Sequence, residues 1–307
     1  MDHGKMKSST RARGRAGKTV VYLLLSVWAV MVLFPFYWML LTSVKSYGAY
    51  NSEYIPQLYT LEPTLENYAD AFTGVPLARY FGNTVIFTVP ISTGIALLIS
   101  VGLSSIKKLR ELYQTVYFLP YVTNTLAVGL VFMILFKKTP YTDGFVNLII
   151  NFFGGTSIDF IDGPYWAKMF VMCFYTIWVV MPFKILILTS ALASVNQDYY
   201  NAAKIDGTSR LRIFTKITLP MISPTVFYLI ITGFIGAFKA YSDAVALFGT
   251  DLNASGMNTI VGYVYDMLYG NSGGYPSYAS AAAIILFAIV LTITCVNMLI
   301  SKKHVHY

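Results

Sequence analysis

One stretch of the chain, from Ser194 to Pro220, has the residue types and spacing for a specific chemistry, and that chemistry is the binding of another protein. It mixes polar, basic and aromatic side chains, although long apolar runs lie on both sides of it. A good helix-forming run ends at Asp206, and Gly207 follows it. Glycine adopts a left-handed conformation at a helix C-terminus without steric cost, so we expect the first helix to end there.

Further helix signals lie on either side of that turn. Asn196 or Asp198 can cap the first turn of the first helix. A second helical run, residues 209–216, leads to Leu219 and Pro220, where we expect the proline to stop the helix. The stretch therefore predicts a helix, a sharp turn and a second short helix, a shape that suits docking into a partner.

The sequence offers no pattern for catalysis or for a metal. No nucleophile stands with a base, and no paired acids or metal-ligand cluster accompany the membrane segments. Cys173 and Cys295 each lie within an apolar run, where cysteine behaves as a small buried hydrophobe. GRAGKT, from Gly14 to Thr19, imitates the end of a phosphate-binding loop, but Ala12 replaces the required glycine and an apolar run follows. We therefore expect no catalytic residue, no metal and no cofactor on this chain.

Composition indicates an integral membrane protein. Of the 307 residues, 56% are hydrophobic and only 12% are charged, whereas about a quarter are charged in a soluble domain. The net charge of +8 comes from basic residues that cluster beside apolar runs, which is the orientation signal of a membrane protein. Basic and aromatic residues do not alternate on a soluble module, so nucleic-acid binding is not expected.

Six apolar runs are long enough to cross a bilayer of about 30 Å as helices. They cover approximately residues 20–42, 83–106, 112–136, 166–192, 221–238 and 278–300. A basic tail, residues 1–19, precedes one transmembrane domain, residues 20–307. Most of the 22 Lys and Arg residues fall where both termini and the central loop are cytoplasmic, as the positive-inside rule requires. The sequence thus predicts an all-α membrane protein with six transmembrane helices and a cytoplasmic helix-turn-helix between the fourth and fifth.

Six spans, no ATPase motif and a helical cytoplasmic loop are typical of a membrane subunit that takes its energy from a partner. The loop resembles the signature of permease subunits of binding-protein-dependent ABC importers, in particular the carbohydrate branch that includes the maltose and glycerol-phosphate importers. That signature is E-A-A-x-x-x-G, extended to E-A-A-x-x-D-G-A, followed by phenylalanine and then I-x-L-P. The matching residues, in the same order and spacing, are Asn201-Ala202-Ala203-Lys204-Ile205-Asp206-Gly207-Thr208, Phe214 and Ile217-Thr218-Leu219-Pro220.

Asn201 stands where the family usually has glutamate, which alters one polar contact with the ATPase and leaves the shape of the loop intact. Three other segments, residues 63–68, 118–120 and 278–282, also resemble the sugar-importer branch, and residues 238–243 resemble it more weakly. The resemblance therefore extends over most of the chain from about Val20 onward.

The resemblance implies a multi-pass subunit of the bacterial cytoplasmic membrane. Its expected partners are membrane lipid, a second permease subunit of different sequence, two ATPase subunits that bind ATP and Mg, and an extracytoplasmic solute-binding protein that delivers a carbohydrate. In the loop, Ala202 and Ala203 would keep the first helix slim enough for a groove of the ATPase. Asp206 would cap or bracket the turn, and Phe214 and Leu219 would be apolar anchors against the partner or the ends of the spans.

Candidate substrate-pathway residues are polar or aromatic groups at membrane depth, because such groups usually face protein or water there. They are Thr123, Asn124 and Thr125, Tyr175 and Trp178, and Tyr241 and Asp243. For Asn124, hydrogen bonding between helices is an equal alternative. Lys184 is expected to reach the cytoplasmic interface with its long side chain. Gly233 and Gly236 are expected to allow close helix packing.

Three alternatives remain open. The same machinery could import a solute other than a sugar, such as glycerol phosphate, a peptide or a polyamine. A secondary transporter or channel would need ion-coupling carboxylates inside the spans, and none of the fourteen acidic residues lies near the middle of one. An ordinary amphipathic loop at the membrane surface is the third interpretation of residues 194–220.

Overall fold

The structure is a computed structural model that describes residues 3–53, 58–74, 77–106, 110–238, 240–270 and 274–304. Side chains are described for 17–53, 58–73, 89–106, 111–238, 240–270 and 274–301. Within these ranges the chain is helical and contains no strand beyond two isolated bridges, Lys45 with Pro63 and Lys138 with Asp143. Lys239, which belongs to the weaker resemblance of residues 238–243, lies outside the described residues.

The described elements follow one another along the chain as α-helices with one π-helical turn, η1. They are α1 (His3–Ser43), α2 (Tyr47–Ser52), α3 (Glu66–Gly74), α4 (Leu77–Ser105), α5 (Arg110–Val122), α6 (Thr125–Phe136), α7 (Phe145–Phe152), α8 (Tyr165–Ser194), α9 (Gln197–Ile205), α10 (Arg210–Ile213), η1 (Phe214–Thr218), α11 (Leu219–Phe238), α12 (Ser242–Phe248), α13 (Leu252–Ser255), α14 (Ile260–Tyr269) and α15 (Pro276–His304).

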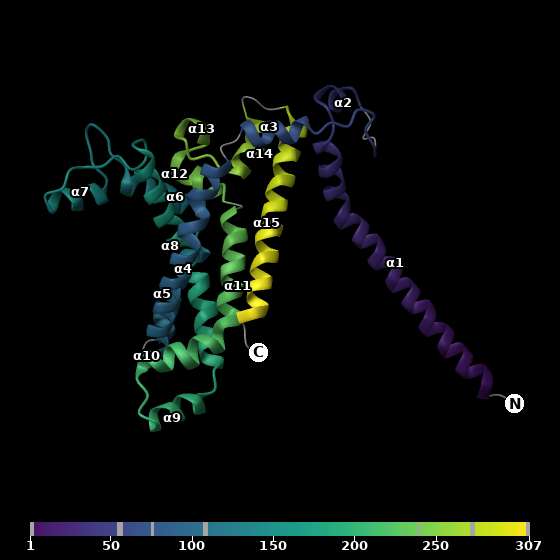
Figure 1. The fold of residues 1–307 in the computed structure, drawn as a ribbon, viewed down its shortest axis with the longest axis horizontal. Helices are drawn as coiled ribbons and strands as arrows, with labels where there is room; N and C mark the ends of the chain where they lie inside the picture. The colour runs from purple at the N-terminus through teal and green to yellow at the C-terminus, as the bar shows by residue number, and fades with distance from the viewer. Residues whose placement is uncertain are drawn as a thin grey trace.

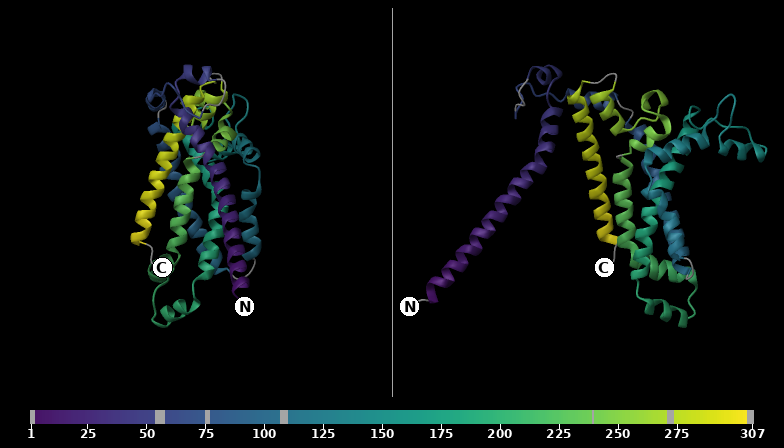
Figure 2. Two further views of the ribbon diagram at one scale, coloured as in Figure 1. Left: turned by 90° about the vertical axis from the view of Figure 1, so that its right-hand side faces the viewer. Right: turned by 180° about the vertical axis from the view of Figure 1, so that it is seen from behind.

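The long helices run side by side as a bundle, and the short ones gather at its two ends (Figure 1). α9 lies at one end, together with both ends of the described chain. α2, α3, α13 and α14 lie at the other end. α1 leans away from the bundle in Figure 1 and in the right-hand view of Figure 2, and it meets α15 near the end that is far from α9, where the rings of Phe36 and Phe287 are 6.3 Å apart. The apolar side chains of α1 are therefore largely uncovered within this chain.

Four helical segments in the described part of the chain are long and apolar enough to cross a membrane, and a bent pair of helices brings the total to five. The four are Gly17–Ser43, Tyr165–Ser194, Arg210–Phe238 and Pro276–Ser301. The expected span at residues 83–106 falls on α4, whose described apolar part is Val89–Ser105. The predicted polar loops contain the short helices α2, α3, α7, α12, α13 and α14.

The predicted single helix over residues 112–136 is wrong, because α5 and α6 meet there at 95°. The side-chain oxygen of Asn124 accepts hydrogen bonds from the backbone N–H groups of Leu126 at 2.9 Å and Ala127 at 3.2 Å. Such an N-cap starts a new helix, because it satisfies donors that would otherwise have no partner. Hydropathy alone cannot detect this break, since both halves are apolar.

Two clusters of buried apolar side chains hold the helices of the bundle together. The first joins α6, the first half of α8, α12 and α13, and it contains Phe132, Phe136 and Tyr175. The second joins α4, the α9-proximal half of α8 and the start of α11, and Leu188 and Leu229 are nearly fully buried in it. A cavity lies between the elements of these two clusters.

Candidate functional site: a helical loop and a cavity in the bundle

The loop begins with α9, whose ends are formed as the sequence predicts. The side chain of Asn196, and not that of Asp198, caps the helix by accepting from the Asp198 N–H at 2.9 Å. At the other end Gly207 has a φ of +68°, which confirms the left-handed residue. The N–H of Gly207 donates to the carbonyl of Lys204 at 3.1 Å, and that of Thr208 donates to the carbonyl of Ala203 at 3.0 Å. These two bonds form a complete Schellman motif, which closes the helix.

The prediction that Pro220 stops the second helix is wrong. The helix that begins at Arg210 continues through η1 into α11 and ends at Phe238. Proline lacks an N–H and its ring crowds the carbonyl four residues earlier, so a regular α-helix resists it. Here the Leu219 N–H reaches back five residues to the carbonyl of Phe214, and this wider π turn opens the helix just before the proline.

The exposed apolar side chains of the loop are not the expected ones. Ile205 is 86% exposed and Leu211 is 74% exposed, so they offer the free apolar surface of the loop. Phe214 and Leu219 are half-buried within this chain. Asn201, Ala202, Lys204, Asp206 and Gly207 of the motif are also exposed, whereas Ala203 is buried.

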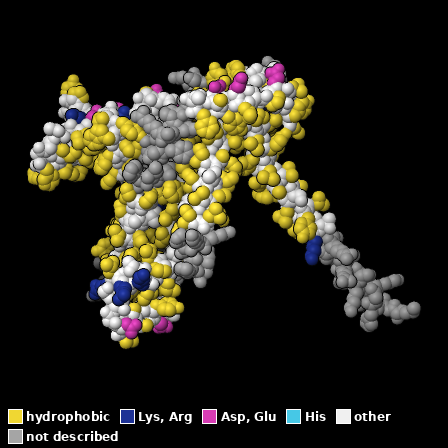
Figure 3. Space-filling model, viewed as in Figure 1, with side chains coloured by type: hydrophobic (Ala, Val, Ile, Leu, Met, Phe, Trp, Pro, Cys, Tyr) yellow, Lys and Arg dark blue, Asp and Glu magenta, His cyan; other side chains and the backbone are white. Residues whose placement is uncertain are grey.

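A hydrogen bond joins the first half of the loop to the second. The hydroxyl groups of Tyr200 in α9 and Thr218 in η1 lie 3.1 Å apart. Thr218 is buried, and Tyr200 is half-buried. Because η1 continues directly into α11, this hydrogen bond connects α9 to the first turns of a helix long and apolar enough to cross a membrane. Figure 3 shows basic side chains around this end of the molecule, and Arg210, Arg212 and Lys216 are exposed there.

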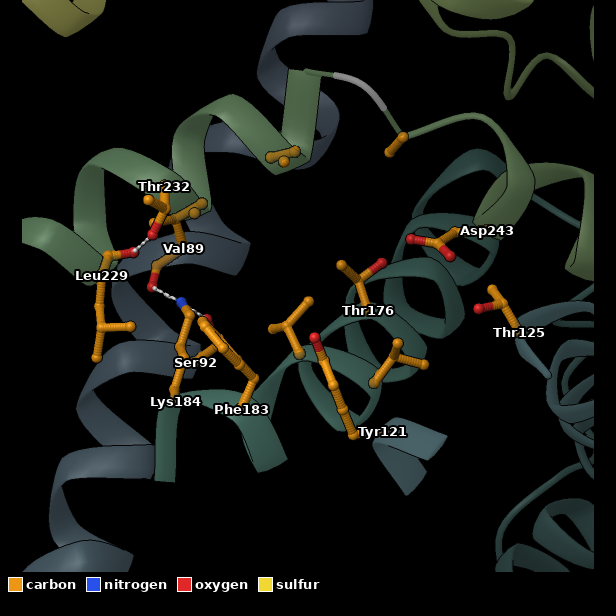
Figure 4. Close-up of a pocket in the computed structure, with 16 residues that line it drawn as sticks. Val89, Ser92, Tyr121, Thr125, Thr176, Phe183, Lys184, Leu229, Thr232 and Asp243 are labelled. Carbon is orange, nitrogen blue, oxygen red and sulfur yellow. Dashed lines mark hydrogen bonds between the residues drawn. The ribbon is translucent and has the colours of Figure 1, made fainter. Parts of the chain in front are cut away.

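The second feature is a cavity of about 320 Å³ inside the bundle (Figure 4). This volume lies at the lower end of the range for small-molecule sites. Residues from α4, α5, α6, α8, α11 and α12 line it: Val89, Ser92, Tyr121, Thr125, Thr176, Val179, Val180, Phe183, Lys184, Leu229, Thr232, Gly233, Gly236, Ala237, Ala240 and Asp243. The rings of Tyr121 and Phe183 stack at 5.6 Å. The wall therefore combines flat aromatic faces, several hydroxyl groups and one charge of each sign.

Lys184 lies on this wall and does not reach the cytoplasmic interface as the sequence predicts. Its side chain is only 4% exposed, and its ammonium donates to Ser92 Oγ at 2.7 Å and Thr93 Oγ1 at 2.8 Å, with the Val89 carbonyl at 3.4 Å. The hydrogen bonds to these α4 oxygens offset part of the free-energy cost of burying the charged ammonium group. They also connect α8 to α4. The lysine lies about ten residues, or about 15 Å, from the end of its helix, which is farther than its side chain extends.

Thr176 contributes a hydroxyl group that has no hydrogen-bond partner within the described structure. Its Oγ1 atom is buried, and the residue lines the cavity. A buried polar group without a partner is costly, and such groups in native proteins call for an explanation. In Figure 4, Thr176 lies between Lys184 and Asp243. A polar ligand in the cavity would provide the missing partner.

Of the seven residues considered for the substrate pathway, the structure places Thr125 and Asp243 on the cavity wall. Tyr175 is fully buried in the aromatic cluster and donates to the Thr125 carbonyl at 2.8 Å. Trp178 packs on Phe132 with the ring centroids 5.2 Å apart. Asn124 is the cap of α6.

Tyr241, another of these candidates, packs on Tyr265 with the ring centroids 5.2 Å apart. Burial, with Tyr265 and Asp266 nearby, raises the pKa of its hydroxyl above the ordinary value. The group thus stays protonated at neutral pH.

Sequence reasoning missed most of the cavity wall. Ser92, Thr176 and Thr232 are single hydroxyl residues inside apolar runs, which give no local signal. The expected close packing at Gly233 is confirmed, because a Cβ there would come within 2.9 Å of Val89 Cγ1 and 3.4 Å of Lys184 Nζ. A Cβ on Gly236 would meet no atom within 4 Å, so this glycine borders open space.

Comparisons with known proteins show the family of this chain. Residues 89–303 match the family described as binding-protein-dependent transport system inner membrane component. The lactose transport permease LacF of Rhizobium radiobacter is 31% identical over 71% of this chain and 72% of its own length. The arabinooligosaccharides permease AraP of Halalkalibacterium halodurans is 29% identical over 70% of this chain, and the chain spans 66% of that relative.

A solved structure has a similar fold. A bacterial ABC transporter involved in the import of the acidic polysaccharide alginate contains a chain that superposes with a TM-score of 0.68. The match covers 98% of both chains at 20% identity, so it bears on the fold alone. With the family match over 70% of its residues and this multi-helix membrane architecture, the chain belongs to the inner membrane permease components of binding-protein-dependent transport systems.

Proposed function

We propose that this chain is one permease subunit of an ATP-driven ABC importer and forms half of the pathway for a carbohydrate. A solute-binding protein outside the membrane would deliver the sugar, and two ATPase subunits carrying ATP and Mg would dock at the loop of residues 194–220. Six spans would cross the membrane, with both termini and this loop in the cytoplasm. A second permease subunit would cover the exposed apolar side of α1, which this chain leaves uncovered.

The observation that carries the choice of a carbohydrate is the wall of the cavity. Hydroxyl groups from Ser92, Thr125, Thr176 and Thr232 can bond to sugar hydroxyls, and the Tyr121 and Phe183 rings offer flat faces to sugar rings. Relatives named for the transport of arabinooligosaccharides and lactose support the same choice.

The continuity of the helix from Arg210 to Phe238 provides a route for coupling. The loop occupies its first turns, and Leu229, Thr232 and Gly233 farther along the same helix line the cavity. Closure of the ATPase subunits on ATP would move α9, and η1 would pass that motion to α11. A two-state bundle biased by a partner's ligand is the general form of such coupling.

The test of this function is an assay of the whole complex in lipid. The chain is purified with its partner permease, ATPase subunits and binding protein, and ATP hydrolysis and solute uptake are measured with candidate sugars. We expect one sugar-loaded binding protein to stimulate both. Uptake that needs an ion gradient and no ATP would contradict the proposal and favour a secondary transporter. Stimulation only by a peptide, a polyamine or glycerol phosphate would retain the importer and reject the sugar.

Ile205→Glu should weaken the docking of the ATPase subunits at least about fivefold, because a buried apolar anchor of this kind contributes more than about 1 kcal/mol. Ile205 is 86% exposed in this chain, so the substitution leaves the fold of the permease unchanged. The measurement is the amount of ATPase retained on the purified permease. Leu61→Glu is the matched control, since Leu61 is 75% exposed in the segment before α3 at the opposite end of the bundle. Equal retention in both variants would place the docking surface elsewhere.

Thr176→Val should lower sugar uptake about two- to tenfold, because it removes one hydrogen bond to the sugar. Such a bond contributes about 0.5–1.5 kcal/mol. The substitution keeps the shape of the side chain and removes a hydroxyl that has no partner within the described structure. Uptake of labelled sugar into proteoliposomes measures the effect.

Thr189→Val is the control for this experiment. Thr189 lies in the same helix, is equally buried and also has an unpartnered hydroxyl within the described structure, but it does not line the cavity. We expect normal uptake for this variant. Normal uptake by Thr176→Val as well would mean that the cavity hydroxyl does not bind the sugar.

A further inference from the structure

α7 is a short helix on an arm that projects from the bundle, and it presents one uncovered apolar stripe (Figure 1). The stripe consists of Phe145, Leu148, Ile149 and Phe152, which are 59%, 55%, 43% and 84% exposed. Their spacing of three, four and seven residues places them on one face of the helix. Phe153, directly after the helix, is 81% exposed and continues the apolar surface.

The opposite face of α7 is fixed to the protein, so the helix cannot roll to hide its stripe. Asn147 is fully buried, and its amide donates to and accepts from the backbone of Ile158, both at 2.9 Å. Val146 and Ile150 pack against the aromatic cluster of α6 and α8. The exposed stripe is therefore a fixed feature of the folded chain.

Polar side chains also hold the helix ends in place. Asp143 accepts hydrogen bonds from Ser157 Oγ at 2.5 Å and from Asn151 Nδ2 at 3.0 Å. Lys138 donates to the Ser157 carbonyl at 2.9 Å. These bonds connect the segment before α7 to the segment after it.

The position of the arm indicates what covers the stripe. The arm joins the bundle where α6 ends and α8 begins, at the end opposite α9. Trp166, in the first turn of α8, is 59% exposed, and exposed tryptophan at a span end marks the boundary between membrane and water. Figure 3 shows hydrophobic side chains along the lower edge of the arm, toward the level of the spans, and charged side chains along its upper edge.

We propose that the α7 stripe lies in the surface of the lipid leaflet opposite the α9 loop. An amphipathic helix with an aromatic face and a polar face buries the apolar side at the boundary of headgroups and acyl chains. Leu130, Ile134 and Phe170 add exposed apolar surface on α6 and α8, the two helices that the arm joins. Such a contact holds the ends of α6 and α8 at one depth while the α9 end moves. This inference concerns membrane contact and does not depend on the identity of the solute.

The test uses a fluorescent label at Phe152→Cys in the complete transporter in lipid, with Cys173 and Cys295 replaced by serine. Lipids carrying a nitroxide near the headgroup should quench this label several-fold more strongly than they quench a label at Leu61→Cys. Aqueous iodide should show the reverse order. Leu148→Cys, on the same stripe, repeats the measurement in case the label at position 152 disturbs the arm.

Two results would overturn the proposal. Quenching by iodide as strong as at Leu61, with no effect of the nitroxide lipids, would show that the stripe is in water. Protection from both quenchers, at both stripe positions, would show that a protein subunit covers it.

Discussion

Gly207→Pro is expected to abolish the stimulation of ATP hydrolysis by the loaded binding protein, while the helical bundle stays folded. Gly207 has a φ of +68°, and proline is restricted to a φ near −65°. Proline would also remove the N–H that donates to the Lys204 carbonyl at 3.1 Å. A cost of about 3 kcal/mol lowers the equilibrium constant for forming the turn by more than about 100-fold. α9 would then point away from its docking position, and stimulated hydrolysis measured in lipid would fall to the basal rate.

Two glycine-to-alanine variants distinguish a loss of coupling caused by the turn of the loop from one caused by backbone strain elsewhere in the chain. A Cβ at Gly207 or at Gly256 would meet no atom within 4 Å, so each alanine introduces only the cost of a positive φ, about 1–2 kcal/mol. Gly256 has a φ of +71° and lies at the opposite end of the bundle. We expect partial loss of coupling for Gly207→Ala and none for Gly256→Ala. Full stimulated hydrolysis in Gly207→Pro would contradict the role of the loop.

Gly129→Ala is expected to cause the largest loss of stability, about 2–3 kcal/mol, because it overpacks a contact between two helices. A Cβ on Gly129 in α6 would come within 2.2 Å of the Ala246 Cβ and 3.1 Å of its Cα in α12. Neither atom can rotate away, so α6 and α12 must move apart. The midpoint of thermal unfolding of the purified protein should fall, and sugar uptake should fall with it because α12 carries Asp243.

Gly236→Ala is the matched control for that substitution. Gly236 also lies in a membrane helix, but no atom lies within 4 Å of the new methyl group. We expect its unfolding free energy to stay the same or to rise by up to about 1 kcal/mol, because alanine favours the helix over glycine. If Gly129→Ala unfolds at the same midpoint as this control, the close approach of α6 to α12 does not hold in the membrane.

Both ends of α9 are set by single residues, whereas the path of the chain after α9 is not. The cap at Asn196 and the left-handed Gly207 follow from the side chains and backbone freedom of single residues, so both could be predicted. The continuation of the helix past Pro220 could not, because it depends on a π turn in the five residues before the proline. The exposed residues Ile205 and Leu211 follow only once the two helices have been placed on the bundle.

The broken segment at Asn124 illustrates a second limit. Hydropathy measures how much a run prefers lipid, and residues on both sides of Asn124 are apolar enough for one span. A side chain that caps a helix inside such a run changes direction without changing hydropathy. The same residue that was considered for the substrate pathway instead turns the chain by 95°.

The sequence by itself determined that this chain is a multi-helix membrane protein with a helix-turn-helix loop, because apolar runs and cap residues act within a single helix. The tertiary structure alone decided which polar groups share a cavity. Lys184, Ser92 and Asp243 come from α8, α4 and α12, and only the packing of these helices brings them to one wall. Burial of the lysine is possible because α4 places its oxygens at hydrogen-bonding distance. The sequence of α8 does not indicate that α4 lies beside Lys184.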